Sequence, residues 1–438
     1  MKLFLTILIC KVSRLILKIL GRGSSMPGKI ALKLYPDILN KIQLPKYIIA
    51  VTGSNGKTST VEMIHEVLDK SNISYAYNYE GSNQIDGVAT LILNNCDFKG
   101  KFLKDVLLLE SDERYAQYTF KYFAPTHYVI NNIYRDQMTR NGNPEFVLKE
   151  IKKSIHPSSK LIINADDPLL YKLIDNNEVI YFGIDDDKNT YKENNYPYDD
   201  GYYCPKCNSR LIYDYHHFGH IGSYHCDNCG FKRQTPKYSV SAINDDFITI
   251  NNKFNIKIAF RTVHNIYNVL AAFSVCAEIG IEEDKIVDAL NNYLIKNGRI
   301  KTFEIGNSKG TLLISKHENS VSYNQNIAYI VDKNEDATVV IIVDAISRKY
   351  FTSETSWLWD INFELLNSNH IKKIVLTGQY VYDLASRFEY AGIDFKKIYL
   401  NSNINEAINY LKDNNENYIY VLTCFSDEHK FTKEVKLI

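Results

Sequence analysis

The sequence predicts an α/β protein in which a larger parallel sheet carries a glycine loop and a smaller, doubly wound sheet follows it. Apolar, strand-like runs alternate with helix-like segments through both halves of the chain, as parallel sheets with helical crossovers require. A glycine-rich turn joins the first strand to a helix, and two Cys-x-x-Cys pairs interrupt the alternation. With 438 residues, the chain can form two or three domains, each with its own core.

The glycine turn lies in the segment VTGSNGKTST, residues 51–60, between an apolar run at 47–51 and a helical segment at 61–68. In such a turn, backbone N–H groups and the helix N-terminus face a phosphate, the Lys reaches the terminal phosphates and the Thr hydroxyl can bind Mg²⁺. The strict motif has Gly at the position of Val51, so this chain carries a variant. We predict that ATP binds to a set of residues in this turn: Gly53, Asn55, Gly56, Lys57, Thr58 and Ser59.

Acidic and amide residues follow the next predicted strands, at 106–109, 127–130 and 160–163. Glu110 ends the first of them, at the edge where parallel sheets bind ligands, and we expect it to contact Mg²⁺ beside Thr58. Polar clusters at 132–137 and 164–167 follow the other two strands and are expected on the same rim of the sheet.

A second candidate nucleotide contact comes from the segment HNIYN, residues 264–268, which opens an Ala-rich helix. Asn265 and Asn268 are three residues apart and can face one way. Their amides can read an adenine edge, although capping the helix is an equally ordinary use of Asn265. Arg299 follows a turn at 297–298, and its guanidinium suits a phosphate or a carboxylate.

Cys204, Cys207, Cys226 and Cys229 form the two Cys-x-x-Cys pairs, with 18 residues between them. This spacing fits one tetrahedral Zn²⁺ held by four thiolates, which leaves no open position, so we predict a structural zinc. Nearby histidines are expected on the surface or in packing: His216, His217, His220 and His225. The other four cysteines are scattered, which favours a reducing, cytoplasmic compartment over a disulfide framework.

The first 45 residues form a lead-in, in which residues 3–20 are apolar except for three basic and two hydroxyl side chains. Lys11, Arg14 and Lys18 share one face of a helix. This helix can lie against anionic lipid or pack on the body of the protein, and we favour packing because any surface helix is amphipathic. The chain as a whole has 51 basic and 51 acidic residues, which gives no electrostatic case for nucleic-acid binding.

The order of these features resembles the Mur ligase family, whose members join an amine to a carboxylate through an acyl phosphate. The resemblance rests on TGSNGKTST, the strand-end Glu110, NADD at 164–167, HNxxN at 264–268 and the Gly298-Arg299 pair. The cysteine insertion, the segment RDQM at 135–138 and SWLWD at 356–360 are similar to the MurT branch of the family, the ligase-like subunits of lipid II isoglutaminyl synthases.

This resemblance implies a lead-in at 1–45, a central ATP-binding domain at 46–302 with a zinc ribbon at about 200–235, and a C-terminal α/β domain at 303–438. It implies ATP-dependent amidation of the D-glutamate α-carboxylate of the lipid II stem peptide, at the inner membrane face, with Lys57 and Glu110 in catalysis. Ammonia would come from a GatD-like glutamine amidotransferase. Asp360 of this chain would orient the catalytic His of that partner. The chain departs from the MurT branch at 316–320 and 344–354.

Two alternatives stay open. A stand-alone Mur-type or folylpolyglutamate-type ligase would add an amino acid without a partner, and a zinc-ribbon adaptor would bind nucleotide without catalysis.

In the C-terminal domain we expect strands at 339–343, 373–377, 398–400 and 418–422, with helices near 363–366, 381–390 and 404–411. Trp357 and Trp359 would share a face if their segment is extended.

Overall fold

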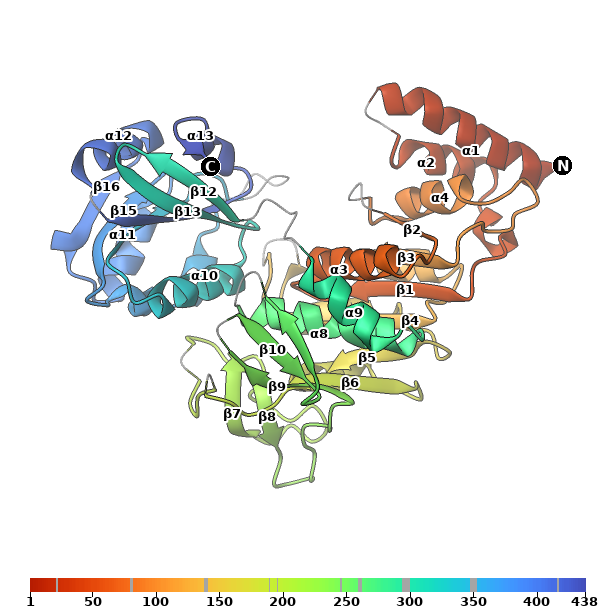
Figure 1. Cartoon of the computed structure of the whole chain (residues 1–438), viewed down its shortest axis with the longest axis horizontal. Coiled ribbons are helices and arrows are strands. Elements are labelled where there is room, and N and C mark those ends of the chain that lie inside the picture. Colours follow the sequence, from red (N-terminus) through yellow and green to blue (C-terminus); the bar gives the residue numbers. More distant parts are fainter. Residues whose placement is uncertain are drawn as a thin grey trace. The chain divides into compact units, whose positions relative to one another are not determined.

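The computed structural model shows two compact units (Figure 1). Unit 1 comprises Met1–Tyr134, Pro144–Asn194 and Asp200–Leu294, and unit 2 comprises Arg135–Asn143, Asn195–Asp199 and Ile295–Ile438. The structure describes residues 1–20, 23–78, 82–137, 141–188, 190–194, 196–244, 246–258, 262–293, 300–346, 353–415 and 417–438. The N-terminal helices belong to unit 1, and the boundary expected at residue 303 lies within a strand of unit 2.

A mostly parallel sheet forms the centre of unit 1. Among the described residues, its strand order is β11-β10-β9-β6-β5-β4-β1-β3-β2, and β10 runs antiparallel to both of its neighbours, β9 and β11. The strands are β1 (Tyr47–Thr52), β2 (Tyr75–Tyr77), β3 (Val106–Glu110), β4 (His127–Ile130), β5 (Lys160–Asn164), β6 (Val179–Ile184), β9 (Tyr238–Ile243), β10 (Phe247–Ile250) and β11 (Phe254–Lys257). The predicted strands at 106–109, 127–130 and 160–163 are confirmed. Their continuous apolar runs match strands that are buried on both faces.

Helices surround this sheet: α1 (Lys2–Ile19), α2 (Met26–Leu34), α3 (Lys57–Lys70), α4 (Ile85–Asn94), α5 (Ala116–Phe120), α7 (Pro144–Lys152), α8 (Val263–Glu278) and α9 (Glu283–Asn291), with 3-10 turns η1 (Ile38–Lys41) and η2 (Pro168–Leu173). Alternate strand residues such as Ile48 and Leu107 join α1, α2 and α4 in one apolar core. Ile7 and Cys10 of α1 belong to this core, so the helix packs on the body of the protein, as the sequence favoured. The helices α3, α8 and α9 pack against one another outside it.

The cysteine insertion forms a separate hairpin on unit 1, made of β7 (Ile212–Phe218) and β8 (Ile221–His225). A small apolar cluster, which includes Leu211, Tyr224 and Phe231, surrounds Cys204 and Cys226. Because this cluster is small, the hairpin has little apolar burial of its own to hold it folded.

Unit 2 contains a second sheet, with the order β16-β15-β14-β17-β13-β12-β18 among the described residues. Its strands are β12 (Ile300–Ile305), β13 (Ser308–Ser315), β14 (Ala337–Ile342), β15 (Ile371–Thr377), β16 (Ile398–Asn401), β17 (Tyr418–Cys424) and β18 (Lys436–Leu437). Its helices are α10 (Ser320–Asp332), α11 (Val381–Tyr390), α12 (Ile404–Asn414) and α13 (Glu428–Thr432), with 3-10 turns η3 (Ser356–Asp360), η4 (Phe363–Leu366) and η5 (Phe395–Lys397). The predicted strands and the helices at 381–390 and 404–411 are present, and 363–366 is a 3-10 turn.

The two tryptophans do not share a face, because η3 is a 3-10 turn rather than an extended segment. In a 3-10 helix, residues two apart point about 120° away from each other. Trp357 is buried, with its ring 5.4 Å from that of Tyr323, whereas Trp359 is 47% exposed beside Tyr390.

Candidate active site and zinc site

The glycine loop connects β1 to α3 in a backbone form that needs its two glycines. Gly53 has φ +131°, and Gly56, the residue before α3, has φ +85°. A Cβ on Gly56 would lie 2.0 Å from Oδ1 of Asn268, so the loop and α8 approach each other too closely for a side chain there. Helix α3 begins at Lys57, and its N-terminus is therefore directed at the loop, as an anion site requires.

Lys57 is buried between a carbonyl and a carboxylate. Its Nζ donates to the Gly53 carbonyl at 2.6 Å and forms an ion pair with Glu113. Burial by itself would lower the pKa of Lys57, but Glu113, with Glu110 and Asp112 nearby, raises it above its usual value. The ammonium thus stays charged and is held at the mouth of the loop.

Glu110 lies at the carboxyl end of β3, where it pairs in register with Val51 of β1. Its Oε1 accepts a hydrogen bond from Asn83 Nδ2 at 3.0 Å, and Asn78 binds its backbone N–H and carbonyl. The carboxylate is therefore oriented beside the strand that leads into the loop. The Glu110 carboxylate also contributes to the raised pKa of Lys57, so the negative charge of Glu110 and the positive charge of Lys57 interact.

Buried asparagine side chains bind the backbone of the glycine loop and the first turn of α3. Asn132 accepts from the backbone N–H of Asn55 at 2.9 Å, and its carbonyl accepts from the N–H of Ser54 at 3.0 Å. Asn131 donates to Thr60 Oγ1 at 2.9 Å, and Thr60 donates to Asn268 Oδ1 at 3.4 Å. These contacts hold the backbone of the loop, so part of the cost of ordering it is met before any ligand arrives.

The HNxxN segment divides between two roles. Thr262, not Asn265, caps α8, because its hydroxyl accepts from the N–H of Asn265 at 3.3 Å. The capping use of Asn265 considered above is therefore wrong, and its half-buried side chain stays a predicted nucleotide contact. Asn268 is buried under Gly56, where its contacts hold the loop. Arg299 lies outside the described residues.

The four cysteines meet at one point, with all four Sγ atoms within 4.8 Å of one another. The Sγ atoms of Cys204 and Cys229 are 3.6 Å apart, and those of Cys207 and Cys226 are 3.5 Å apart. Thiolates bound at about 2.3 Å in a tetrahedron would be about 3.8 Å apart, so the cluster fits Zn²⁺. The metal-binding group found among the described residues contains these cysteines and no histidine. His216, His217 and His220 are buried in packing, as predicted.

The hairpin is joined to the rim of the sheet through Asp166. This carboxylate is buried and accepts from Arg233 Nε at 2.5 Å, from Tyr267 Oη at 2.7 Å and from the N–H of Ile184 at 2.7 Å. Its carbonyl accepts from Gly222 of β8 at 2.9 Å. The acidic pair at 166–167 was expected as a polar cluster on the rim, and Asp166 serves there as the anchor of the ribbon.

Tyr134 connects the hairpin to the glycine loop. Its N–H donates to Ser54 Oγ at 2.9 Å, and Ser54 donates back to its carbonyl at 3.1 Å. Its ring lies 5.9 Å from Phe218 and 5.2 Å from His220, both in the hairpin, and 5.1 Å from His264. Burial lowers the pKa of His264 to about 3, so the His264 ring of this cluster is neutral.

Asp360 belongs to unit 2, at the end of η3. Its Oδ1 accepts from Arg135 Nη1 at 3.3 Å, and its carbonyl accepts from Asn324 Nδ2 at 2.9 Å. Asn324 also accepts from the N–H of Asn362 at 2.7 Å, so its amide holds the backbone on both sides of Asp360. The side chain is 21% exposed, which leaves it reachable from outside.

The departing segment 316–320 also has a place in unit 2. Asn319 is buried and donates to Asp136 Oδ1 at 2.7 Å, while Lys316 lies 3.8 Å from the other oxygen of that carboxylate. The N–H of Gln137 donates to the Glu318 carbonyl at 3.2 Å. These residues hold the 135–137 segment, and residues 347–352 of the second departing segment lie outside the described residues.

Comparison with known proteins gives the family. The Mur ligase middle domain matches residues 51–276, and the MurT ligase C-terminal domain matches residues 317–427. The MurT subunit of lipid II isoglutaminyl synthase from Staphylococcus aureus is 31% identical over 402 residues, which cover 90% of this chain and 89% of that protein. The chain belongs to the MurT family of Mur ligases. The MurT subunit from Streptococcus pneumoniae is 30% identical over 436 residues, covering 97% of this chain and 95% of that protein.

Solved structures agree on the fold. A pseudomurein peptide ligase type C from Methanothermus fervidus aligns with a TM-score of 0.65 at 22% identity, covering 89% of this chain and 78% of that one. MurF from Acinetobacter baumannii aligns with a TM-score of 0.64 at 16% identity, covering 93% and 80%. MurF from Thermotoga maritima, solved in complex with ADP, aligns with a TM-score of 0.58 at 17% identity, covering 91% and 80%. The MurT chain thus has the fold of the Mur ligases.

Proposed function

We propose that this chain is the ATP-using subunit of a two-chain amidating enzyme. Its reaction converts the D-glutamate α-carboxylate of the lipid II stem peptide to D-isoglutamine, with ammonia delivered by a GatD-like glutamine amidotransferase. The observation that carries the proposal is the prebuilt glycine loop, with the charged, buried Lys57 beside Glu110 at the carboxyl edge of β1 and β3. The names of the relatives that match about 90% of the chain support the choice of substrate.

The chemistry follows from the need to activate a carboxylate, which is a poor electrophile. The terminal phosphoryl group of ATP passes to a carboxylate oxygen, which gives an acyl phosphate and ADP. Ammonia then attacks the acyl carbon, phosphate leaves with the C–O bond electrons, and the nitrogen gives up one proton as the amide forms. Lys57 neutralises charge on the transferred group, and the N–H groups of the loop and of α3 hold the other phosphates. Thr58 and Glu110 would hold Mg²⁺, which supplies further charge neutralisation when bound.

The remaining nucleotide contacts of the proposal are Asn265 and Asn268, whose amides would read the adenine edge, and Arg299, whose guanidinium would bind a phosphate. Cys204, Cys207, Cys226 and Cys229 would hold a structural Zn²⁺, which fixes the hairpin when bound. The substrate is met at the inner face of the cell membrane. For domains, we propose a lead-in at 1–45, a central domain at 46–302 with its ribbon at about 200–235, and a C-terminal domain at 303–438.

Asp360 is proposed to complete the partner's active site. A glutaminase of the Cys-His type needs a carboxylate to orient its His, and an acid from a neighbouring chain can serve. Two features suit Asp360 for this role: its partly exposed carboxylate, and the backbone clamp made by Asn324. Arg135 donates a hydrogen bond to this carboxylate and directs it until the partner binds.

Two substitutions in the reconstituted complex test the proposal. Lys57→Ala should abolish ATP-dependent formation of amidated lipid II, whereas Lys70→Ala, an exposed Lys at the end of the same helix, should leave it unchanged. Full product from Lys57→Ala would favour the adaptor alternative. Activity of the isolated chain with an amino acid, and none with ammonia, would favour a stand-alone ligase.

Asp360→Ala separates the two half-reactions. Glutamine-dependent turnover should fall by about a hundredfold or more, while turnover with ammonium salts should persist. Asp413→Ala, an exposed carboxylate of unit 2, is the matched control. Unchanged use of glutamine by Asp360→Ala would show that the assignment to the partner's site is wrong.

A further inference from the structure

The helix α1 is apolar on two sides, and only one of them is covered. Ile7 and Cys10 are buried in the core of unit 1, whereas the opposite side is open. The exposed fractions there are 40% for Ile9, 59% for Ile16 and 87% for Ile19. The full exposed set on this helix is Phe4, Leu5, Ile9, Val12, Leu15, Ile16, Ile19 and Leu20.

The exposed residues form one continuous stripe. Positions 5, 9, 12, 16 and 19 follow one another at spacings of three and four, which keeps them on a single face of the helix. The stripe extends past the helix, because the Phe4 ring lies 5.0 Å from that of Phe98, which is itself 43% exposed. Monomeric proteins rarely leave so many large apolar side chains together in water, which makes this face a candidate interaction surface.

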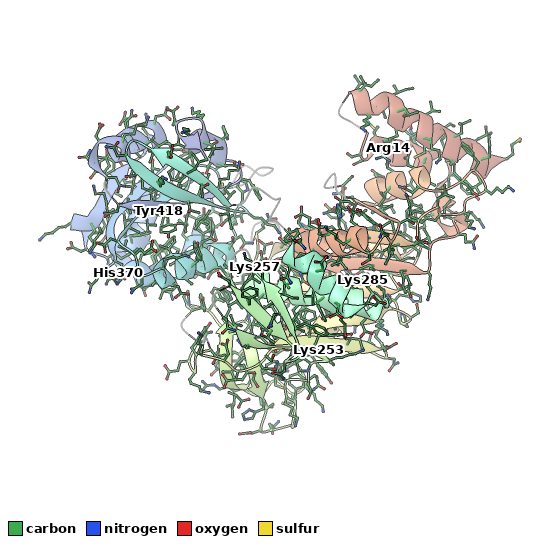
Figure 2. All side chains as sticks on the ribbon, in the orientation of Figure 1. Arg14, Lys253, Lys257, Lys285, His370 and Tyr418 are labelled. Carbon is green, nitrogen blue, oxygen red and sulfur yellow. The ribbon has the colours of Figure 1, made fainter. Side chains whose placement is uncertain are left out.

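The charge around the stripe indicates which occupant. Seven Lys and Arg residues and no acidic residue precede Asp37. Lys2 is exposed at the start of α1, and Lys99 and Lys101 are exposed around Phe98. Arg14, on the same helix (Figure 2), lines a small cavity with Asn78 and Thr90 and so lies on the inner side. An apolar stripe edged by lysines complements an anionic lipid surface.

We propose that the outer face of α1, with Phe98, docks on the surface of a membrane that contains anionic lipid. Because α2 and α4 hold the inner face, only the outer face can enter the lipid, and the helix lies along the surface (Figure 1). The structure has no helix, within the part of the chain described, that is long and apolar enough to cross a membrane. This inference deepens the proposed function, since it assigns a surface to the meeting with a lipid-borne substrate.

The test uses the full-length chain and sedimentation with vesicles that contain no substrate or nucleotide, so that its failure would leave the amidation proposal untouched. The vesicles are equal mixtures of phosphatidylglycerol and phosphatidylcholine, compared with phosphatidylcholine alone. The variant carries Leu15→Gln, Ile16→Gln and Ile19→Gln, which keep good helix formers at exposed positions. Its binding to anionic vesicles should fall by about tenfold or more.

Two controls keep the result interpretable. Tyr382→Gln, Phe395→Gln and Leu400→Gln remove exposed apolar side chains from unit 2 and should leave binding unchanged. Lys2→Gln with Lys99→Gln should weaken binding to anionic vesicles by about fivefold for each charge removed, with no effect on neutral vesicles. Circular dichroism and the thermal midpoint of each variant should match the parent chain.

Three results would overturn the proposal. The parent chain fails to sediment with anionic vesicles, or the α1 variant sediments as well as the parent. In the third, the parent is a dimer by light scattering, the α1 variant is a monomer and neither binds vesicles, which would assign the stripe to a second copy of the chain.

Discussion

The pair of Lys57 and Glu113 offers the sharpest test of how the loop is built. Both side chains are nearly buried, with exposed fractions of 8% and 5%, so water cannot replace a lost partner. Removing one member of such a pair typically costs about 3–5 kcal/mol, because the other charge stays buried and uncompensated. Here Lys57 keeps the Gly53 carbonyl and the field of Glu110, so we expect about 2–3 kcal/mol for Glu113→Gln.

A double-mutant cycle measures the coupling. Lys57→Met should cost about 3 kcal/mol, since Glu113 then lacks its cation, and the double variant should cost about 2–3 kcal/mol less than the sum of the two. The assay is urea unfolding by far-ultraviolet circular dichroism, with zinc present and nucleotide absent. Both tryptophans lie in unit 2, so their fluorescence follows that unit separately. Additivity to within about 0.5 kcal/mol would refute the buried ion pair.

Three further predictions concern the loop, the ribbon and the aromatic cluster. Gly56→Ala should weaken ATP binding, measured by calorimetry, by about tenfold or more, because Gly56 has a positive φ and lies against Asn268. Adding Asn268→Ala should restore part of the affinity. Equal losses in the single and the double variant would contradict the contact between Gly56 and Asn268. Metal analysis should find one zinc per chain in the parent and none in Cys226→Ser. The thermal unfolding midpoint of this variant should fall by about 5 °C or more. A metal-free chain of unchanged stability would refute the zinc site. His264 has a pKa lowered to about 3, so the stability that it contributes as a neutral ring is present above about pH 6.5 and is lost as pH falls toward 3. Between pH 7 and pH 5 the free energy of unfolding of the parent should fall by about 2 kcal/mol relative to that of His264→Phe. Parallel pH profiles of the two proteins would contradict this.

The sequence was a good guide wherever chemistry depends on local spacing. The loop at 53–59, the four cysteines and the alternating strands of unit 1 follow from residue types within a few positions of each other, and backbone geometry then leaves little freedom. The strand-end position of Glu110 was equally readable, because parallel pairing aligns it with Val51.

The sequence could not show which of several similar neighbouring residues makes a given contact, or which distant residues meet. Glu113, rather than Asp112, pairs with Lys57, a choice made by the turn after β3. The link from Tyr134 to Ser54 and the ribbon joins residues about 80 positions apart, which no local pattern encodes. For the tryptophan segment we considered only an extended backbone, whereas the structure has a 3-10 turn that buries Trp357 against Tyr323.

The interleaving of the units has a practical consequence for anyone who wishes to dissect this chain. Unit 2 takes in residues 135–143 and 195–199 as well as 295–438, so no single cut releases it whole. A truncated fragment starting near residue 303 would lack Arg135, leaving the carboxylate of Asp360 without its guanidinium, and Asn319 would lose Asp136. Failure of such a fragment to capture a glutaminase would therefore say little about the intact surface.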